Sequence, residues 1–324
     1  MTRYYLFGSN YSPFSEPHLE HELRKLEYLK GSALKCDLVV TRNLKTAKVA
    51  AVLFPGKKIL VWTHEPRYDG TSKKRVNYIG RTIHIFNVFT GDVFWHNGHF
   101  FNRYHYNEAI DLGITTETLR PAEEVVSKKQ FEERKMLIGM FTRKETEQFD
   151  YIVAGQNTDL NQKRQELAWA GYKSGDSDIV GRNWGSGIAL EASGHDGVED
   201  TPWWTRKIEL LNRYRFSIAI ENTLWPCYVT EKIWQSICAY SLPIYHGRGS
   251  SIYNDFPESS FIDSSVHQSP QETINVIRNT SYEEWTYRLN ACIEVYNQFA
   301  RQRRTEGALG LTETMDRITR RLHL

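Results

Sequence analysis

The sequence predicts an α/β protein built from two Rossmann-like domains that face a central cleft. In each half of the chain, short apolar segments alternate with segments that have helical spacing, which is typical of βαβ units with parallel strands. The length of 324 residues suits two domains, since about 150 residues make an average domain. A third observation is a clear strand–helix–strand crossover in the second half, and it also contains most of the functional information.

The composition is that of a globular protein and excludes several classes of function. Hydrophobic residues make up 40% and charged residues 25%, so a disordered or fibrous chain is excluded. The 41 Lys and Arg nearly balance the 39 Asp and Glu, so we expect no nucleic-acid partner. We see no transmembrane run of about 18 apolar residues and no signal peptide. These patterns predict a cytoplasmic or peripheral membrane protein.

In the N-terminal half, the pattern predicts one helix among several strands. Leucines at 19, 23, 26 and 29 form an apolar stripe, which predicts a helix over 18–31. We expect the strands of this half at 2–7, 36–41, 49–55, 58–66 and 81–89. We assign residues 1–125 to the first domain.

A highly charged segment with one proline, residues 119–135, predicts a linker between the domains. We therefore assign residues 126–300 to the second domain. Its first part reads as a strand at 135–142, a helix at 161–173 and a long Gly-, Ser- and Asp-rich loop at 171–199. The crossover follows, with a strand at 216–221, a helix at 229–240 and a strand at 242–246.

The C-terminal segment, residues 301–324, is basic and has helical spacing. Residues 299–324 contain six Arg against three acidic residues, and the apolar positions are Leu311, Met315, Ile318 and Leu322. Two interpretations stay open. The segment is a terminal helix that packs back on the folded domains, or it is an interfacial helix on an anionic membrane.

Four cysteines are scattered without the spacing of a zinc site, so we expect no metal centre: Cys36, Cys227, Cys238 and Cys292. Free thiols are the simplest interpretation, although four cysteines could form two disulfides. Asp176-Ser177-Asp178 has a spacing that can hold Mg²⁺ or Mn²⁺. It lies in the Ser- and Gly-rich segment, so we expect no required cofactor and at most stimulation by Mn²⁺ or Mg²⁺.

The crossover places charged residues where an α/β sheet binds ligands. Glu221 and Asn222 follow the strand, and ligands bind at the carboxyl ends of such strands. Lys232 falls in the first turn of the helix, where a cation opposes the helix dipole. A phosphate at the helix N-terminus would compensate that cost. The alternatives are a Lys232 that points to solvent or pairs with Glu231, and a Glu221 that only caps or braces the loop.

The segment AIENTLWPCYVTEKIWQSICAYSLPIYHG resembles the signature of family 10 glycosyltransferases, the α1,3/4-fucosyltransferases. The matching positions are Glu221, Asn222, Tyr228, Val229, Thr230, Glu231, Lys232, Pro243, Gly247 and Ser260-Phe261-Ile262. The resemblance covers 216–263 well and 131–190 loosely. In the N-terminal half, His64-Glu65-Pro66 is similar to an E-x-P segment of the family. Trp225-Pro226-Cys227 and His246 depart from its usual residues.

The resemblance implies a GT-B fold in which the C-terminal domain binds GDP-fucose and the N-terminal domain binds the acceptor. It implies inverting transfer of fucose, in α1,3 or α1,4 linkage, to a hydroxyl of an N-acetylglucosamine-containing glycan. The acceptor would be N-acetyllactosamine-like, a lipopolysaccharide or an N-glycan. The donor-binding residues that it implies are Arg182 and Lys232 at the phosphates, Glu231 at the ribose or fucosyl ring, and Glu221, Asn222 and Tyr228.

Inverting transfer needs a base for the acceptor hydroxyl. We predict Glu65, at the end of the strand KILVWTHE, with His64 as its rival because imidazole titrates near neutral pH. Arg164 either reaches the donor or lies on a helix surface. Two other functions stay open: a GT-B transferase with a different nucleotide-sugar donor, and a glycan- or nucleotide-binding protein without turnover.

Overall fold

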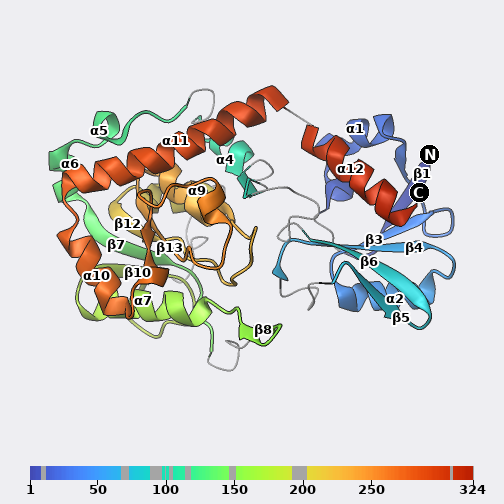
Figure 1. Ribbon diagram of the computed structural model, residues 1–324, viewed down its shortest axis with the longest axis horizontal. Helices are drawn as coiled ribbons and strands as arrows, with labels where there is room; N and C mark the ends of the chain where they lie inside the picture. Colours follow the sequence, from blue (N-terminus) through green and yellow to red (C-terminus); the bar gives the residue numbers. More distant parts are fainter. Residues whose placement is uncertain are drawn as a thin grey trace. The chain divides into compact units, whose positions relative to one another are not determined.

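The computed structural model describes residues 1–8, 12–66, 73–87, 97–98, 100–101, 105–113, 118–145, 151–191, 203–306 and 309–323. The chain forms two compact units, each with a six-stranded sheet (Figure 1). Unit 1 contains Met1–Trp95 and Glu306–Leu324, and unit 2 contains His96–Thr305. The predicted boundary at 125/126 therefore lies inside unit 2.

The charged segment near that boundary is part of unit 2 because its apolar residues are buried. It forms two short helices, α5 (Ala122–Val125) and α6 (Lys128–Glu133). Ala122 and Phe131 are 0% and 5% exposed and belong to the core of unit 2. Ser127 and Gln130 form a capping box at the start of α6, which is a local signal for a helix rather than a linker.

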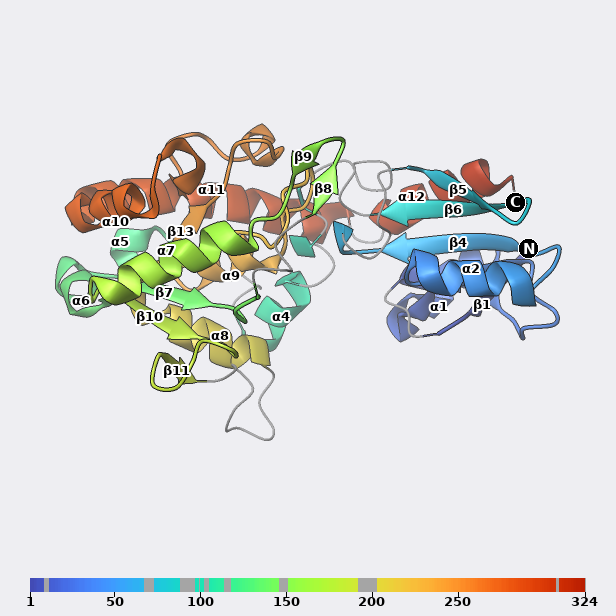
Figure 2. The ribbon, with the colours of Figure 1, turned by 90° about the horizontal axis from the view of Figure 1, so that it is seen from below.

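The sheet of unit 1 has the strand order β2-β1-β3-β4-β6-β5. Its pairs are parallel except for β5 with β6, which are antiparallel. The strands are β1 (Thr2–Leu6), β2 (Tyr28–Lys30), β3 (Leu38–Thr41), β4 (Lys58–Thr63), β5 (Arg75–Tyr78) and β6 (Arg81–Asn87). Helix α2 (Leu44–Leu53) covers one face and packs on β3, β4 and β6 (Figure 2).

Two sequence predictions in unit 1 are wrong. The predicted strand at 49–55 lies mostly in α2, because Asn43 caps the helix by accepting a hydrogen bond from the Thr46 amide at 2.8 Å. An apolar run of this length does not distinguish a strand from a buried helix. The predicted helix at 18–31 is only α1 (Glu20–Lys25). Glu27, at φ 62°, then turns the chain into β2.

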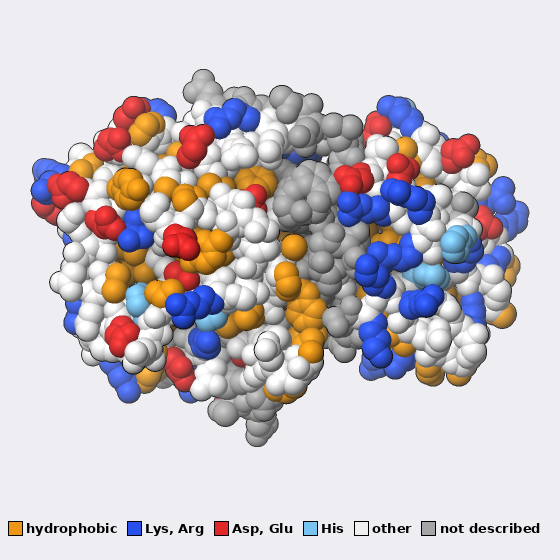
Figure 3. All heavy atoms as spheres, viewed as in Figure 1, with side chains coloured by type: hydrophobic (Ala, Val, Ile, Leu, Met, Phe, Trp, Pro, Cys, Tyr) orange, Lys and Arg blue, Asp and Glu red, His pale blue; other side chains and the backbone are white. Residues whose placement is uncertain are grey.

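Helix α12 (Leu309–Leu322) is part of unit 1. Its apolar residues Met315 and Ile318 are 1% and 0% exposed, and Thr319 hydrogen-bonds to the Tyr28 hydroxyl at 2.6 Å. Of the two interpretations of this segment, the structure therefore shows the packed helix. Lys and Arg side chains gather on the surface of this unit (Figure 3); those from α12 and the neighbouring strands include Lys58, Arg75, Arg317, Arg320 and Arg321.

The sheet of unit 2 is parallel throughout and has the order β11-β10-β7-β12-β13-β14. The strands are β7 (Lys135–Met140), β10 (Ser177–Val180), β11 (Ala189–Glu191), β12 (Tyr214–Ile218), β13 (Leu242–Tyr245) and β14 (Ile262–Asp263). The predicted loop at 171–199 is thus wrong where β10 and β11 form. From β7 the chain continues to β10 and β11 on one side of the sheet, and from β12 it continues to β13 and β14 on the other side. The carboxyl ends of β7 and β12 therefore flank the topological switch point, where such sheets bind ligands.

The helices of unit 2 form groups on the two faces of this sheet. Besides α5 and α6, the described part of unit 2 contains the helices α4 (Tyr106–Asp111), α7 (Asn161–Lys173), α8 (Trp203–Leu211), α9 (Glu231–Cys238), α10 (Pro270–Asn279) and α11 (Tyr282–Glu306). Helix α7 contacts α10, β7 and β10, whereas α8 contacts α9 and β12. The short strands β8 (Ile152–Val153) and β9 (Gln156–Asn157) pair with each other. No helix in the described part of the chain is long and apolar enough to cross a bilayer.

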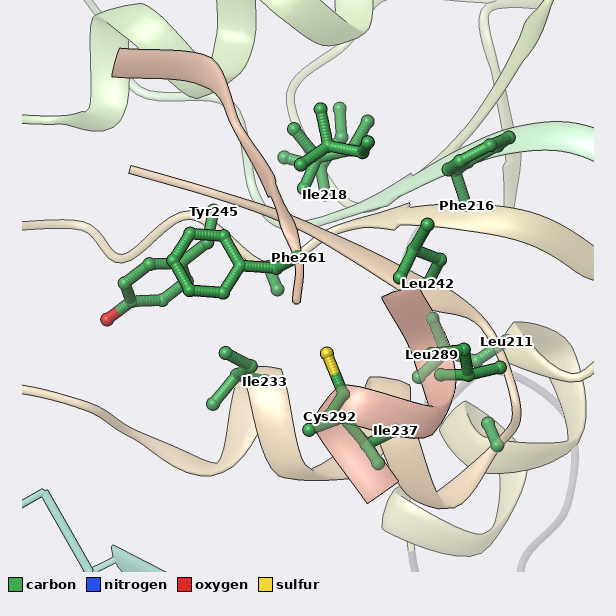
Figure 4. Packing of buried hydrophobic residues seen from close by; sticks show 14 of the residues in the cluster. Leu211, Phe216, Ile218, Ile233, Ile237, Leu242, Tyr245, Phe261, Leu289 and Cys292 are labelled. Carbon is green, nitrogen blue, oxygen red and sulfur yellow. The ribbon is translucent and has the colours of Figure 1, made fainter. Parts of the chain in front are cut away.

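Helix α9 is held rigidly in the core of unit 2. Ile233 and Ile237 are completely buried and face Phe261 and Cys292 in one cluster (Figure 4). Burial of a side chain of this size contributes about 1.5–3 kcal/mol, so the position of the α9 N-terminus is fixed by packing. All four cysteines are free thiols. The alternative of two disulfides is therefore wrong.

Candidate functional site

Glu221 organises the loop between β12 and α9. Its carboxylate lies beyond the end of β12, is 2% exposed and accepts a hydrogen bond from the Thr230 amide at 2.7 Å. The Thr230 hydroxyl donates to it at 2.8 Å. Thr230 is the N-cap residue, but its own side chain does not cap the helix. Glu221 therefore braces the loop just before the helix, as the loop-bracing interpretation predicted.

Lys232 is part of the same network and does not point freely into solvent. Its ammonium group lies 2.9 Å from Glu221 Oε2, 2.7 Å from the Thr230 hydroxyl and 3.5 Å from Glu231 Oε1. Burial would lower the pKa of Lys232, but Glu221 and Glu231 raise it above its usual value. The two carboxylates thus offset the cost of a cation in the first helical turn.

Glu231 and Glu221 have opposite pKa shifts although they share Lys232. Burial would raise the pKa of Glu231, but Lys232 and Lys207 outweigh it and lower the pKa to about 2. Burial raises the pKa of Glu221, against the opposing effect of Lys232. The network therefore keeps one partly exposed carboxylate firmly ionised at the edge of the site.

Three cationic side chains from three helices line a narrow hollow beside this network. Arg164 comes from α7, Lys207 from α8 and Lys232 from α9. The other lining residues come mainly from β7, β12 and the ends of α8 and α9: Ile138, Met140, Phe141, Leu211, Ile218 and Ser236. The hollow therefore lies at the switch point of the sheet, and its charge suits an anionic group.

Arg164 is buried, so of its two interpretations the helix-surface one is wrong. Its side chain is 5% exposed, donates to Asn161 Oδ1 at 2.5 Å and lies 4.7 Å from the centre of the Phe141 ring. Lys207 was not predicted from the sequence. The available signal was its spacing, because Lys207 shares the buried face of α8 with Leu211.

Arg182 lies on the neighbouring strand end, in the turn after β10, and is exposed. Gly181 precedes it with φ 142°, and a Cβ atom there would lie 2.1 Å from the Phe141 carbonyl oxygen. Glycine is therefore required for the ends of β10 and β7 to approach each other. The Arg143 amide donates to the Arg182 carbonyl at 3.0 Å, which fixes the backbone that presents the guanidinium group.

Asn222 and Tyr228 both support the loop. The Asn222 carbonyl accepts hydrogen bonds from the Leu160 amide at 3.0 Å and the Asn161 side chain at 3.2 Å. The Tyr228 ring is 1% exposed and packs edge-on against Phe100 at 5.9 Å. In this structure Tyr228 does not present a ring face for stacking, so its contact with a donor stays a prediction.

Glu65 and His64 follow β4 at the carboxyl edge of the sheet of unit 1, and both side chains are partly exposed. The indole of Trp62 donates a hydrogen bond to His64 Nε2 at 2.7 Å. The lone pair of that nitrogen is therefore occupied, which makes His64 the weaker candidate for a base. Glu65 stays the predicted base.

The D-x-D sequence lies at the opposite edge of the sheet, where β10 begins. Asp176 forms a 2.6 Å ion pair with Arg278. Asp178 lies 2.6 Å from Lys135 Nζ and accepts from the Tyr214 hydroxyl at 2.7 Å. Both carboxylates already have cationic partners, so they do not fit a divalent cation. Among the residues described here, no group of three or more His, Cys, Asp or Glu side chains could hold a metal ion.

Comparison with known proteins assigns this region to a family. Residues 187–291 match the family model "Glycosyltransferase family 10 (fucosyltransferase) C-term". This segment is therefore similar to the C-terminal domain of family 10 fucosyltransferases. The site network from Glu221 to Lys232 lies within it, as the sequence resemblance predicted.

Curated relatives are similar over a short segment. A human protein named 4-galactosyl-N-acetylglucosaminide 3-alpha-L-fucosyltransferase FUT6 is 34% identical over 82 residues, which are 25% of this chain and 23% of the relative. The human 3-galactosyl-N-acetylglucosaminide 4-alpha-L-fucosyltransferase FUT3 gives the same identity and coverage. The match thus spans about a quarter of the length of these relatives.

Solved structures show similarity over the whole fold. A crystal structure of an alpha1,3-fucosyltransferase has a TM-score of 0.51 and 15% identity, and the match covers 91% of this chain and 81% of that chain. A crystal structure of alpha1,3-fucosyltransferase with GDP has a TM-score of 0.51 and 14% identity, covering 95% and 92% of the two chains. The predicted GT-B fold with two Rossmann-like domains is confirmed.

Proposed function

We propose that this protein is an inverting glycosyltransferase that moves fucose from GDP-fucose to a hydroxyl group of an N-acetylglucosamine-containing glycan, in α1,3 or α1,4 linkage. The observation that carries the proposal is the overlap of the family 10 domain with the Glu221–Lys232 network. That network adjoins a hollow lined by three cations at the sheet's switch point. A nucleoside diphosphate has the matching negative charge.

In the proposed chemistry, the cations of unit 2 act on the leaving group and a carboxylate acts on the sugar. As the bond between the sugar C1 and the phosphate oxygen breaks, negative charge develops on GDP, and Lys232 and Arg182 stabilise it. Glu231, ionised at neutral pH, faces the ribose or the fucosyl ring, where a carboxylate stabilises oxocarbenium-like charge. Because cationic side chains hold the phosphates, we propose that no metal is required and that Mn²⁺ or Mg²⁺ at most stimulates transfer.

We propose Glu65 as the general base. Its carboxylate removes the proton of the acceptor hydroxyl as that oxygen forms its bond to C1. Glu65 follows β4 at the carboxyl edge of the unit 1 sheet, the kind of edge where α/β sheets bind ligands, and the proposed donor residues belong to unit 2. We propose N-acetyllactosamine-like glycans, lipopolysaccharide or N-glycans as the acceptors.

The decisive experiment measures GDP release from GDP-fucose with and without N-acetyllactosamine, followed by a panel of acceptor glycans. Release that depends on an acceptor, with inverted anomeric configuration in the product, is the expected result. Turnover of another nucleotide sugar instead would show a different donor. GDP binding without turnover on any acceptor would contradict the enzyme proposal and indicate a binding protein.

We propose that any membrane contact is peripheral and made by the basic surface of α12, since its apolar face is buried. The arginines of that surface are Arg317, Arg320 and Arg321. Co-sedimentation with vesicles of anionic lipid should capture the protein and should be lost at high salt. Equal binding to neutral vesicles would contradict this proposal.

A further inference from the structure

Lys207 is a buried cation whose contact is a cation–π contact with Trp203, and it has no hydrogen-bond or ion-pair partner in the described part of the chain. The side chain is 8% exposed, and its ammonium group lies 5.3 Å from the centre of the Trp203 ring. Within the described ranges, Lys207 makes no hydrogen bond and no ion pair. A buried charge is normally paired, because desolvation of an isolated ammonium costs several kcal/mol.

Charged groups lie around Lys207 on several neighbouring elements, but among the described residues none of the acidic ones forms an ion pair with it. They are Glu231 and Lys232 of α9, Glu108 of α4, Glu221 after β12, His105 before α4 and Arg164 in the shared hollow. Burial is the largest effect on Lys207 and lowers its pKa to about 8, against the attraction of Glu231. The ammonium is thus charged at neutral pH and available for a ligand.

The position of Lys207 identifies the kind of ligand. It lines the same hollow as Arg164 and Lys232, beside the N-terminus of α9, whose backbone amides favour an anion. Ser236 of α9 also lines the hollow. Three cations from three helices converge on this narrow hollow, and Lys207 among them has no ion-pair partner in the described part of the chain, so the hollow suits a single oxygen atom of an anionic group.

We propose that Lys207 is a phosphate-binding residue of the donor site, whose ammonium donates to a phosphate oxygen of the nucleoside diphosphate together with Lys232 and Arg164. This inference rests on the proposed function, because it assumes that the site takes a nucleotide-sugar donor. The proposal adds a residue that is distant in sequence from the Glu221–Lys232 motif. Lys207 lies near that motif only because α8 packs on α9.

The test is calorimetric titration of the full chain with GDP, and with guanosine, which lacks the phosphates. Lys207→Met should weaken GDP binding about 10- to 100-fold, the value of a hydrogen bond to a charged group, and leave guanosine binding unchanged. Lys207→Arg should retain most of the GDP affinity. Lys173→Met is the matched control, because Lys173 also lies 5.3 Å from an indole ring, that of Trp169, but is exposed.

The pH dependence of GDP affinity distinguishes a phosphate contact of Lys207 from a role in packing alone. GDP affinity of the wild-type protein should fall above about pH 8, where Lys207 loses its proton. The decrease should be absent in Lys207→Arg and Lys207→Met, because neither side chain titrates there. GDP affinity and pH dependence unchanged in Lys207→Met, or equal losses for guanosine, would overturn the assignment and leave the proposed function intact. Failure of the wild-type protein to bind GDP would overturn both.

Discussion

The carboxyl edges of the two sheets differ in how their functional residues are held. In unit 2, Glu221, Thr230 and Lys232 form one buried network within twelve residues of sequence. In unit 1, Glu65 stands partly exposed two residues after β4. The difference teaches that the proposed donor side is preorganised by buried charges, whereas the proposed base lies on a partly exposed strand end.

The largest effect should come from the partly exposed carboxylate of Glu65. Glu65→Gln keeps the shape of the side chain but cannot accept a proton, so transfer should fall about 10²–10⁴-fold. GDP-fucose affinity should stay the same, since the donor residues belong to unit 2. Steady-state kinetics and titration measure the two quantities.

Glu27→Gln is the control for this variant, because Glu27 is an exposed carboxylate of the same unit. Turnover close to that of the wild type would show that the base lies elsewhere, with His64 the next residue to test. A loss of donor binding as well would make Glu65 a donor-side or structural residue.

The buried network should respond in stability as well as in binding. Lys232→Met leaves the carboxylate of Glu221 buried without its cation, which should lower the free energy of unfolding by about 3 kcal/mol. GDP affinity should fall too. Urea denaturation and titration measure both. The double variant with Glu221→Gln should regain part of the stability, because it removes the unpaired charge, and a strictly additive loss would contradict the network.

Arg182 should behave differently from Lys232, because its side chain is exposed. Arg182→Ala should weaken GDP binding about tenfold, as expected for a lost charged hydrogen bond, and change the free energy of unfolding by less than about 0.5 kcal/mol. Arg143→Ala, on the neighbouring strand end, is the control. Unchanged GDP affinity in Arg182→Ala would remove it from the phosphate site.

The buried network should also make the stability of unit 2 sensitive to acid. The folded pKa of Glu231, about 2, lies below its unfolded value near 4.5. Its contribution to stability is therefore complete above about pH 4.5 and is lost as the pH falls through 2. Glu231→Gln should flatten this part of the stability curve. An identical acid transition in Glu231→Gln and the wild type would contradict the assigned pKa.

The smallest effect is expected at the opposite edge of the unit 2 sheet. Asp178→Asn should leave transfer and any response to Mn²⁺ or Mg²⁺ unchanged, because Asp178 pairs with Lys135 away from the site. Activity assays with and without EDTA test this. Loss of a metal response in this variant would show that the D-x-D sequence binds the ion.

The sequence by itself determined the Glu221–Lys232 motif, because its residues are local. Spacing on one βαβ unit was enough to predict that Glu221 and Lys232 lie at a strand end and a helix start. It also predicted α7 over 161–173 as the structure has it, Asn161–Lys173, because helical periodicity is a local property.

Only the tertiary structure decided which distant residues join that motif and where the units divide. Lys207 and Arg164 reach the hollow through the packing of α7 and α8, and no spacing in the sequence encodes a contact between separate helices. The segment at 49–55 became part of a helix because burial under the sheet and the Asn43 cap outweighed its strand-like composition. Residues 306–324 belong to unit 1 because the apolar face of α12 is buried there. The hydrophobic effect stabilises this packing between segments that are far apart in sequence.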